Sequence, residues 1–362
     1  MSNTTTHLEP IKRLTRDIRE SAITLSSSEA RFLVSDYYMM QDQRIRAANQ
    51  VRAMVESKEP HGILNFFADQ SQTLENQVKS ALEAYARGNP VGRWSMSITG
   101  IGPVIAAGLL AHIDIKKAPT VGHIWRFGGY DPTLKWLGKV GAEKLLGEVI
   151  ETVAGEADDG EPDQYALTEE QISNLNEILG EGKCRLELRQ LAAISLMTNR
   201  RIESFFRLGR DDKGNITRQS MLKMLAKRPW NASLKVLFWK AGESFVKVSG
   251  NKNDIYGKLY LIRKAEEQQK NEAGVYKPQA DELLASKKIG KETDAYKAYS
   301  VGMLPPAHLH ARAKRYAVKI FLSHWHEAAY WAEFKKAPPL PFAIAHLGHA
   351  HLLECPNLDL VK

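Results

Sequence analysis

The stretch "ITGIGPVIAAGLLAHI", residues 98–113, decides how the rest of the chain is interpreted. Gly100 and Gly102 flank one isoleucine, Pro103 follows at once, and an apolar, alanine-rich segment completes the stretch. Glycine admits the backbone of a tight turn, and proline suits the first turn of a helix. The pattern therefore predicts a turn followed by a buried helix. The turn could hold a nucleotide, hold a nucleic-acid backbone, or only begin the helix.

The nucleotide interpretation fails on the spacing of the glycines. A dinucleotide fingerprint needs GxGxxG between a strand and a helix. Here Ile105 takes the place of the third glycine, Pro103 follows the second, and an amphipathic helix precedes the turn instead of a strand. A GxxxxGK[ST] phosphate loop is also absent from the sequence.

A helix-hairpin-helix accounts for the stretch better. Unbonded amides at the start of the second helix would bind phosphate oxygens without reading the base sequence. We therefore predict DNA contacts at the turn by Gly100, Ile101, Gly102 and Val104. The alternative is a sharp turn between packed helices that binds nothing.

The composition is that of a folded protein with one large or two modest domains. The chain has 362 residues, of which 43% are hydrophobic and 25% charged. The apolar stretches are shorter than the roughly 18 to 20 residues of a membrane span, and residues 1–10 are polar, so we expect a cytoplasmic protein with no membrane partner. Cys184 and Cys355 are too far apart to suggest a disulfide framework or a cysteine zinc site.

Charge is unevenly distributed along the chain. The net charge is +8, which favours a polyanionic partner. Residues 143–181 hold 12 acidic residues and one basic residue, whereas residues 183–264 hold 19 basic and 6 acidic residues. The basic segment is thus the place to look for nucleic-acid contacts.

Helical periodicity dominates the sequence, and strand-like alternation is scarce, so we predict a mainly α fold. Before residue 88, two apolar stripes with helical spacing predict two long amphipathic helices, broken near residues 59–62. Ser26 and Glu29 are spaced as a capping box for the first of them. The stripes could pair with each other or, as a coiled coil, with a second copy in a homo-oligomer. They are Val34, Tyr38, Ile45, Ala48, Val51 and Val55, then Ile63, Phe67, Leu74, Val78, Ala81 and Tyr85.

Basic and aromatic residues alternate in "RQSMLKMLAKRPWNASLKVLFWKAGESFVK", residues 218–247. Lysine and arginine at this density neutralise phosphates and make binding dependent on salt. Trp230 would stack on an unpaired base, whereas Phe238 and Trp239 are assigned to the core. The alternative is a solvated basic face without a ligand. The predicted DNA contacts here are Arg218, Lys223, Lys227, Arg228, Trp230, Asn231, Lys235 and Lys240.

The last third predicts a mobile polar segment over residues 277–300, a long helix over residues 307–335 and an irregular tail. No cofactor is expected other than a divalent or monovalent cation. The late histidines could hold a divalent cation if the tail folded back on His324, which keeps open a metal-dependent nuclease or hydrolase. These histidines are His308, His310, His324, His326, His346, His349 and His351.

Three blocks of the sequence resemble a known family. "GIGPVIAAGLLAHI" with "TVGHIWRFGGYDP", then "AKRPWNASLKVLFWKAGESFVK" with "IYGKLYLIRK", and finally "ARAKRYAVKIFLSHWHEAAYW" are similar to the C-terminal helix-hairpin-helix domain of insertion-sequence transposases of the 110/116/902 group. The resemblance implies a DNA-binding protein of transposition or recombination, with structured RNA as a further polyanion. It also implies a coiled-coil-like region at 1–95, the transposase-like domain at 96–136 and 225–336, an insertion at 137–224 and a tail at 337–362.

Two features depart from that family. Its complete members carry a RuvC-like nuclease domain with acidic residues on an initial strand, and no such strand is predicted here. The place of the family's serine nucleophile, after "FGGYDP", reads Thr133–Leu134–Lys135–Trp136. We therefore assign no catalytic residue and expect no autonomous strand transfer. A purely structural helical oligomer is a further alternative.

Overall fold

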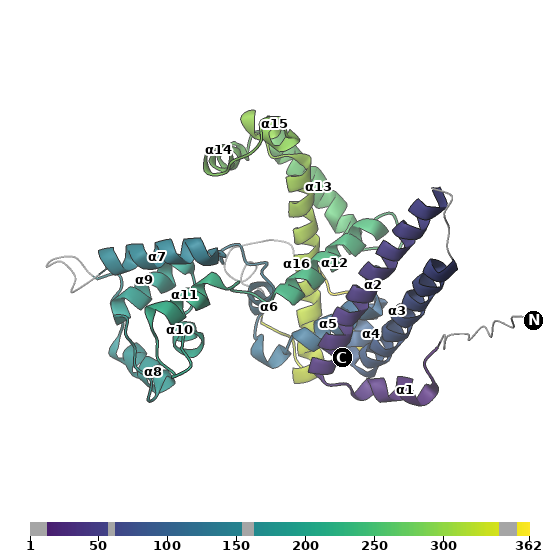
Figure 1. Ribbon diagram of the computed structural model, residues 1–362, viewed down its shortest axis with the longest axis horizontal. Helices are drawn as coiled ribbons and strands as arrows, with labels where there is room; N and C mark the ends of the chain where they lie inside the picture. Colours follow the sequence, from purple (N-terminus) through teal and green to yellow (C-terminus); the bar gives the residue numbers. More distant parts are fainter. Residues whose placement is uncertain (1–12, 57–61, 154–162, 340–352) are drawn as a thin grey trace, which may run out of the picture. The chain divides into compact units, whose positions relative to one another are not determined.

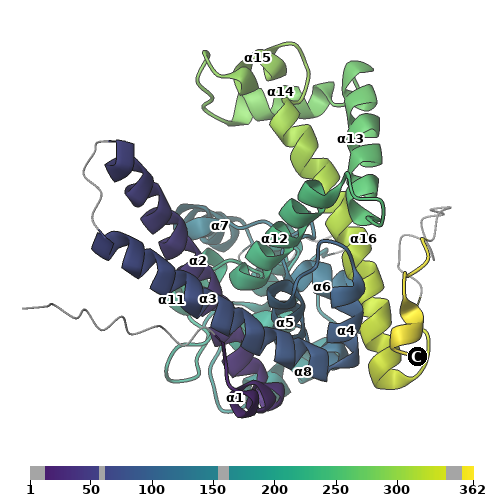
Figure 2. The ribbon, with the colours of Figure 1, turned by 90° about the vertical axis from the view of Figure 1, so that its right-hand side faces the viewer.

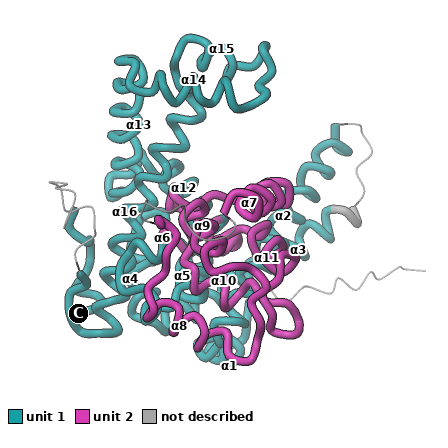
Figure 3. The backbone as a smooth tube through the Cα atoms, turned by 90° about the vertical axis from the view of Figure 1, so that its left-hand side faces the viewer, with its two compact units in different colours: residues 1–124, 236–362 teal, residues 125–235 magenta. Residues whose placement is uncertain are grey.

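The computed structural model describes residues 13–56, 62–153, 163–339 and 353–362. The described chain is helical, and its β-structure is limited to isolated bridges of Ile216 with Cys184 and Arg210. The prediction of a mainly α fold is confirmed. Contacts divide the chain into unit 1, residues 1–124 with 236–362, and unit 2, residues 125–235 (Figure 3). No described helix has the length and apolar character needed to cross a bilayer.

Unit 1 begins with two short helices, α1 (Arg16–Ser21) and η1 (Ala22–Thr24), and a pair of long ones, α2 (Ser27–Glu56) and α3 (Gly62–Gly88). The long helices lie side by side in the same chain (Figures 1 and 2). Ser26 and Glu29 form the predicted capping box, since each backbone amide bonds the other's side chain at 2.7 and 3.3 Å. The predicted break at residues 59–62 lies largely outside the described residues.

Helices α4 (Pro90–Ser97) and α5 (Pro103–His112) carry the stretch that opened the sequence analysis. Every residue of α5 from Val104 to Leu109 is buried, as expected of a helix that is apolar on all sides. The neighbouring core is aromatic: Trp94 stacks on Phe321, with ring centroids 6.1 Å apart, and Phe245 packs against the edge of Phe321. The predicted buried helix is confirmed.

The rest of unit 1 comprises η2 (Ile115–Lys117), most of α12 (Ala232–Val248), α13 (Tyr256–Glu272), α14 (Lys277–Ser286), α15 (Asp294–Ser300), α16 (Pro306–Phe334) and η3 (Leu358–Leu360). The helix predicted over residues 307–335 is therefore confirmed as α16. Residues 277–300, predicted as a mobile polar segment, instead form α14 and α15. Their helices pack through a small core of Tyr276, Ala280, Leu304 and Leu309.

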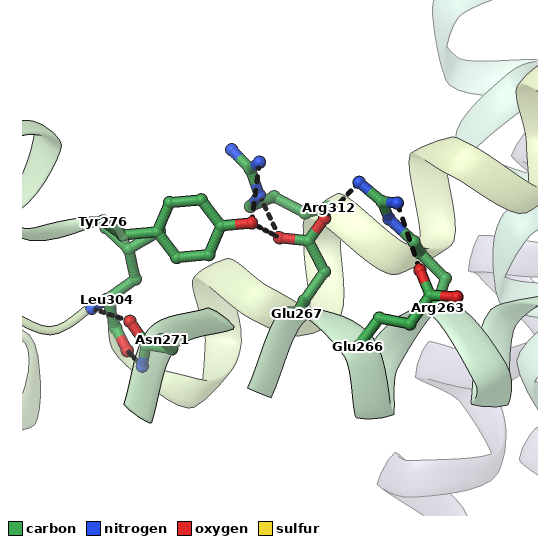
Figure 4. A network of polar contacts seen from close by, with 7 residues as sticks. All are labelled: Arg263, Glu266, Glu267, Asn271, Tyr276, Leu304 and Arg312. Carbon is green, nitrogen blue, oxygen red and sulfur yellow. Dashed lines mark hydrogen bonds and ion pairs between the residues drawn. The ribbon is translucent and has the colours of Figure 1, made fainter. Parts of the chain in front are cut away.

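A buried carboxylate joins α13, α14 and α16. The Glu267 side chain is 1% exposed and pairs with Arg312 and Arg263, each at 2.6 Å, while the Tyr276 hydroxyl donates to it at 2.6 Å (Figure 4). Asn271 exchanges two hydrogen bonds with the backbone of Leu304, at 2.8 and 3.0 Å. These polar contacts thus add to the small apolar core in holding α13, the start of α14 and α16 together.

Unit 2 holds α7 (Gly138–Thr152), α8 (Glu169–Leu179), α9 (Leu188–Thr198), α10 (Ile202–Leu208) and α11 (Arg218–Ala226), and α6 (Val121–Phe127) runs across its boundary. Thr168 and Gln171 form the capping box of α8. The insertion predicted at 137–224 lies wholly inside unit 2, but the unit is larger. The amide of Asn231 bonds the carbonyl of Phe127 at 2.8 Å, which ties together the two ends of the unit.

Candidate nucleic-acid interface

The Gly-Ile-Gly turn connects α4 to α5, so the predicted helix-hairpin-helix is present. Gly100 has a φ of +96°, where side chains are strained. A Cβ there would lie 3.1 Å from Cγ2 of Val248, and the Ser244 hydroxyl donates to the Gly100 carbonyl at 2.5 Å. Gly100 is therefore needed for the turn to pack on α12.

Gly102 differs from Gly100 because the fold does not require a glycine at position 102. It has a φ of −89° and a ψ of 174°, which any residue adopts, and an added Cβ would meet nothing within 4 Å. Gly102 is exposed and occupies the N-cap of α5 without a capping side chain. The amides of Val104 and Ile105 have no capping acceptor among the described residues. This end of α5 suits an anion that approaches the backbone closely.

Ile101 and Val104 were predicted to contact DNA through the backbone of the turn, with their apolar side chains in the core. Both side chains are buried, at 4% and 6% exposure. Their place in the core is confirmed, and the DNA contact of their backbone stays a prediction. What they offer a ligand is limited to their backbone.

A second loop lies beside the turn, between α12 and α13. The Thr99 hydroxyl donates to the carbonyl of Asn253 at 3.3 Å. Lys252 and Lys258 are exposed, and the Lys258 ammonium donates to the Lys252 carbonyl at 2.8 Å. Buried Asp254 accepts from the amides of Gly257 and Lys258 at 3.0 and 2.8 Å, which fixes the start of α13. The loop thus presents two lysines next to the turn.

Sequence reasoning missed this loop as a site. "GNKNDIYGK", residues 250–258, was interpreted only as a turn before a charged helix. Its lysines are two among nineteen basic residues of the segment, and the Thr99–Asn253 contact, which the sequence does not reveal, places their loop beside the turn.

The predicted basic block is divided between the two units. Lys240 lies in unit 1 with the turn, whereas the other seven predicted residues lie in unit 2. Arg218, Lys223, Lys227 and Arg228 are exposed, and the Arg228 guanidinium lies 4.9 Å from the centroid of the Trp136 ring. These four residues remain available to a polyanion.

Trp230 and Asn231 have structural roles. A Cβ on Gly129 would lie 2.7 to 3.0 Å from the Trp230 ring, so the indole packs directly on that glycine, and the Lys235 ammonium lies 3.9 Å from the ring centroid. Asn231 accepts from the Leu234 amide at 2.9 Å and caps α12. Packing on Gly129 and the Lys235 ammonium thus already engage the Trp230 ring, and its stacking on a base stays a prediction.

Among the described late histidines, His324 and His326 are buried and hydrogen-bonded within the fold. Nε2 of buried His324 donates to the Leu353 carbonyl at 2.9 Å, so Nδ1 accepts from the Tyr256 hydroxyl at 2.7 Å. His326 Nε2 donates to the carbonyl of Ala118 at 2.8 Å. His346, His349 and His351 lie outside the described residues. Among the described residues, no group of three histidine, cysteine, aspartate or glutamate side chains is placed to hold a metal ion.

Comparison of the chain with family models, with curated proteins and with solved structures gives no match. The functional argument therefore depends on the geometry described above.

Proposed function

We propose that this chain binds nucleic acid through its sugar-phosphate backbone and acts as a DNA-binding protein in transposition or recombination. The observation that carries the proposal is Gly102. It begins a helix, is exposed, and lacks a side chain at a position where the fold permits one. A phosphate oxygen that approaches the amides of Val104 and Ile105 requires that open space.

The neighbouring lysines support the same ligand. Lys252 and Lys258 bring two positive charges beside the turn, and Asp254, the acidic residue of that loop, is buried as a helix cap. Amides and ammonium groups recognise phosphate rather than base edges, so binding would be independent of base sequence. Duplex DNA and structured RNA both present this chemistry.

A salt titration of duplex affinity tests the proposal. Affinity of the whole chain for a short duplex should fall steeply with salt, with a slope that reflects the phosphates contacted. The double variant Lys252→Glu with Lys258→Glu should weaken binding and flatten the slope by about 2, since each lost contact removes about 0.9.

The matched control is Arg52→Glu with Lys79→Glu, which makes the same change in net charge at exposed positions of α2 and α3. It should bind nearly as the natural chain does. Equal losses in both double variants would mean that net charge alone attracts DNA. Absence of binding at low salt would refute the proposal altogether.

We further propose that α2 and α3 associate with a second copy of the chain. The two helices pack against each other within one chain, and Ala30 and Leu82 on them are fully buried. Phe67, Leu74 and Val55 of their predicted stripes nevertheless remain 58%, 47% and 57% exposed. Exposed apolar side chains favour self-association. Phe67→Lys with Leu74→Lys should lower the mass measured by light scattering to that of one chain, and an unchanged mass would exclude this surface.

A further inference from the structure

We propose that Trp239 is a stacking platform for an unpaired base, so that unit 1 takes a single-stranded segment of nucleic acid along α12. The inference extends the proposed function, since it uses the same ligand. It rests on two observations, which are the exposure of this indole and the lysine ammonium groups near its ring.

The exposure of Trp239 is unusual for its helix. The buried face of α12 consists of Leu234, Leu237, Phe238, Ala241 and Phe245, none more than 2% exposed. Trp239 is 50% exposed, and Val236, one turn earlier, is 52% exposed. Helical spacing places Glu243 and Lys247 on this same outer face. The Trp239 indole is therefore not part of the core and lies at the surface of α12.

The ammonium groups of two lysines lie near the exposed Trp239 ring. The ammonium of Lys314, from α16, lies 5.5 Å from the Trp239 ring centroid, and that of Lys240 lies 6.0 Å from it. Lys314 forms an ion pair with Glu243. The Lys240 ammonium lies 4.3 Å from the ring centroid of Tyr38, and its contacts within the described ranges are with aromatic rings rather than a carboxylate. Lys240 therefore keeps positive charge beside the indole, and Lys247 lies about two turns further along the same face of α12.

A single strand of nucleic acid can contact both the exposed indole and the neighbouring lysines. Each unpaired base offers a flat apolar face to the indole, and each linking phosphate offers a negative charge to the lysines. A duplex keeps its base faces stacked within the helix and has nothing to place on Trp239. The exposed tryptophan thus favours a single strand, while the amides at Gly102 recognise the phosphates that both forms share.

Trp239 lies apart from the Gly-Ile-Gly turn. Ser244 and Val248, which contact Gly100, are five and nine residues after Trp239. At 3.6 residues per turn they point about 140° and about 180° away from it around α12. The indole is therefore a contact separate from the amides at Gly102, and the two are tested independently.

The test compares a short oligothymidine with a duplex of equal length, each fluorescently labelled, by anisotropy with the whole chain. Trp239→Ala should weaken binding of the single strand about tenfold, which is the order contributed by stacking one base. Binding of the duplex should not change. Trp239→Phe keeps an aromatic face and should recover most of the lost affinity.

Trp136→Ala is the matched control, because Trp136 is 51% exposed and also lies beside a cation, but belongs to unit 2. It should bind both probes as the natural chain does. Unchanged single-strand binding by Trp239→Ala would overturn the inference, and so would equal losses for single strand and duplex. If neither probe binds the natural chain, the proposed function itself fails, which is a different result from duplex binding that persists without a role for Trp239.

Discussion

At the scale of the residue, two glycines that look alike in the sequence prove to have different roles. Gly100 is required by its φ of +96°, whereas Gly102 has an ordinary backbone and open space around it. The sequence predicts the turn but not this distinction, which depends on Val248 lying against one glycine and nothing against the other. The assignment of Trp239 to the core is wrong, since its side chain is 50% exposed. The sequence could have predicted this, because the period of Leu234, Phe238, Ala241 and Phe245 leaves Trp239 off the buried stripe.

The first prediction concerns Gly100. Gly100→Ala should lower the free energy of unfolding by about 1 to 2 kcal/mol, because an L-residue is strained at positive φ and its Cβ would crowd Val248. Gly102→Asn should leave stability nearly unchanged, since asparagine is a favourable N-cap. Urea denaturation of the two variants measures the difference. Equal stabilities would contradict the structural roles assigned to the two glycines.

The second prediction concerns His324. Burial lowers the pKa of His324 below its usual 6.5, so the folded chain holds this ring neutral while the unfolded chain protonates it more readily. Its contribution to stability is therefore present above pH 6.5 and declines as the pH falls below that value. His324→Gln should reduce the slope of unfolding free energy against pH in this range. A slope identical to that of the natural chain would show that His324 does not titrate on unfolding.

At the scale of the element, helices with an apolar stripe are predictable and polar helices are not. The apolar stripe of α2 and the apolar segment after Pro103, which forms α5, each place a helix correctly. Helices α14 and α15 were missed because their local sequence is polar, and their order depends on partners distant in the chain. Asn271 with Leu304, and Glu267 with Arg312, supply those contacts.

The third prediction concerns Glu267. Burial raises the pKa of this carboxyl, but hydrogen bonds from Tyr276 and Arg312 and the charges of the arginines outweigh it and hold the pKa below 4.5. The stabilisation is present above pH 4.5 and is lost as the pH falls below it. Glu267→Gln at neutral pH should cost about 3 kcal/mol, because it leaves charges without their partner. A loss under about 1 kcal/mol, measured by urea denaturation, would contradict this role.

At the scale of the whole molecule, the sequence predicts which segment is basic, but it does not predict how the basic residues are divided between the two units. The basic residues 183–264 stand out by charge, but they divide between unit 1 and unit 2. Boundaries drawn at residues 137 and 225 follow the limits of recognised sequence blocks. The compact units follow contacts instead, such as the bond between Asn231 and Phe127, which the sequence does not reveal.

The binding of duplex DNA by Gly102→Asp and Gly102→Asn tests the central claim most directly. Both side chains are good N-caps and nearly equal in size, so they separate the effect of charge at the start of α5 from that of folding. We expect Gly102→Asn to bind more weakly than the natural chain, because its side chain obstructs the phosphate. Gly102→Asp should bind more weakly still, because its carboxylate repels the phosphate. Natural affinity in both variants, with the fold intact, would show that nucleic acid does not contact this turn.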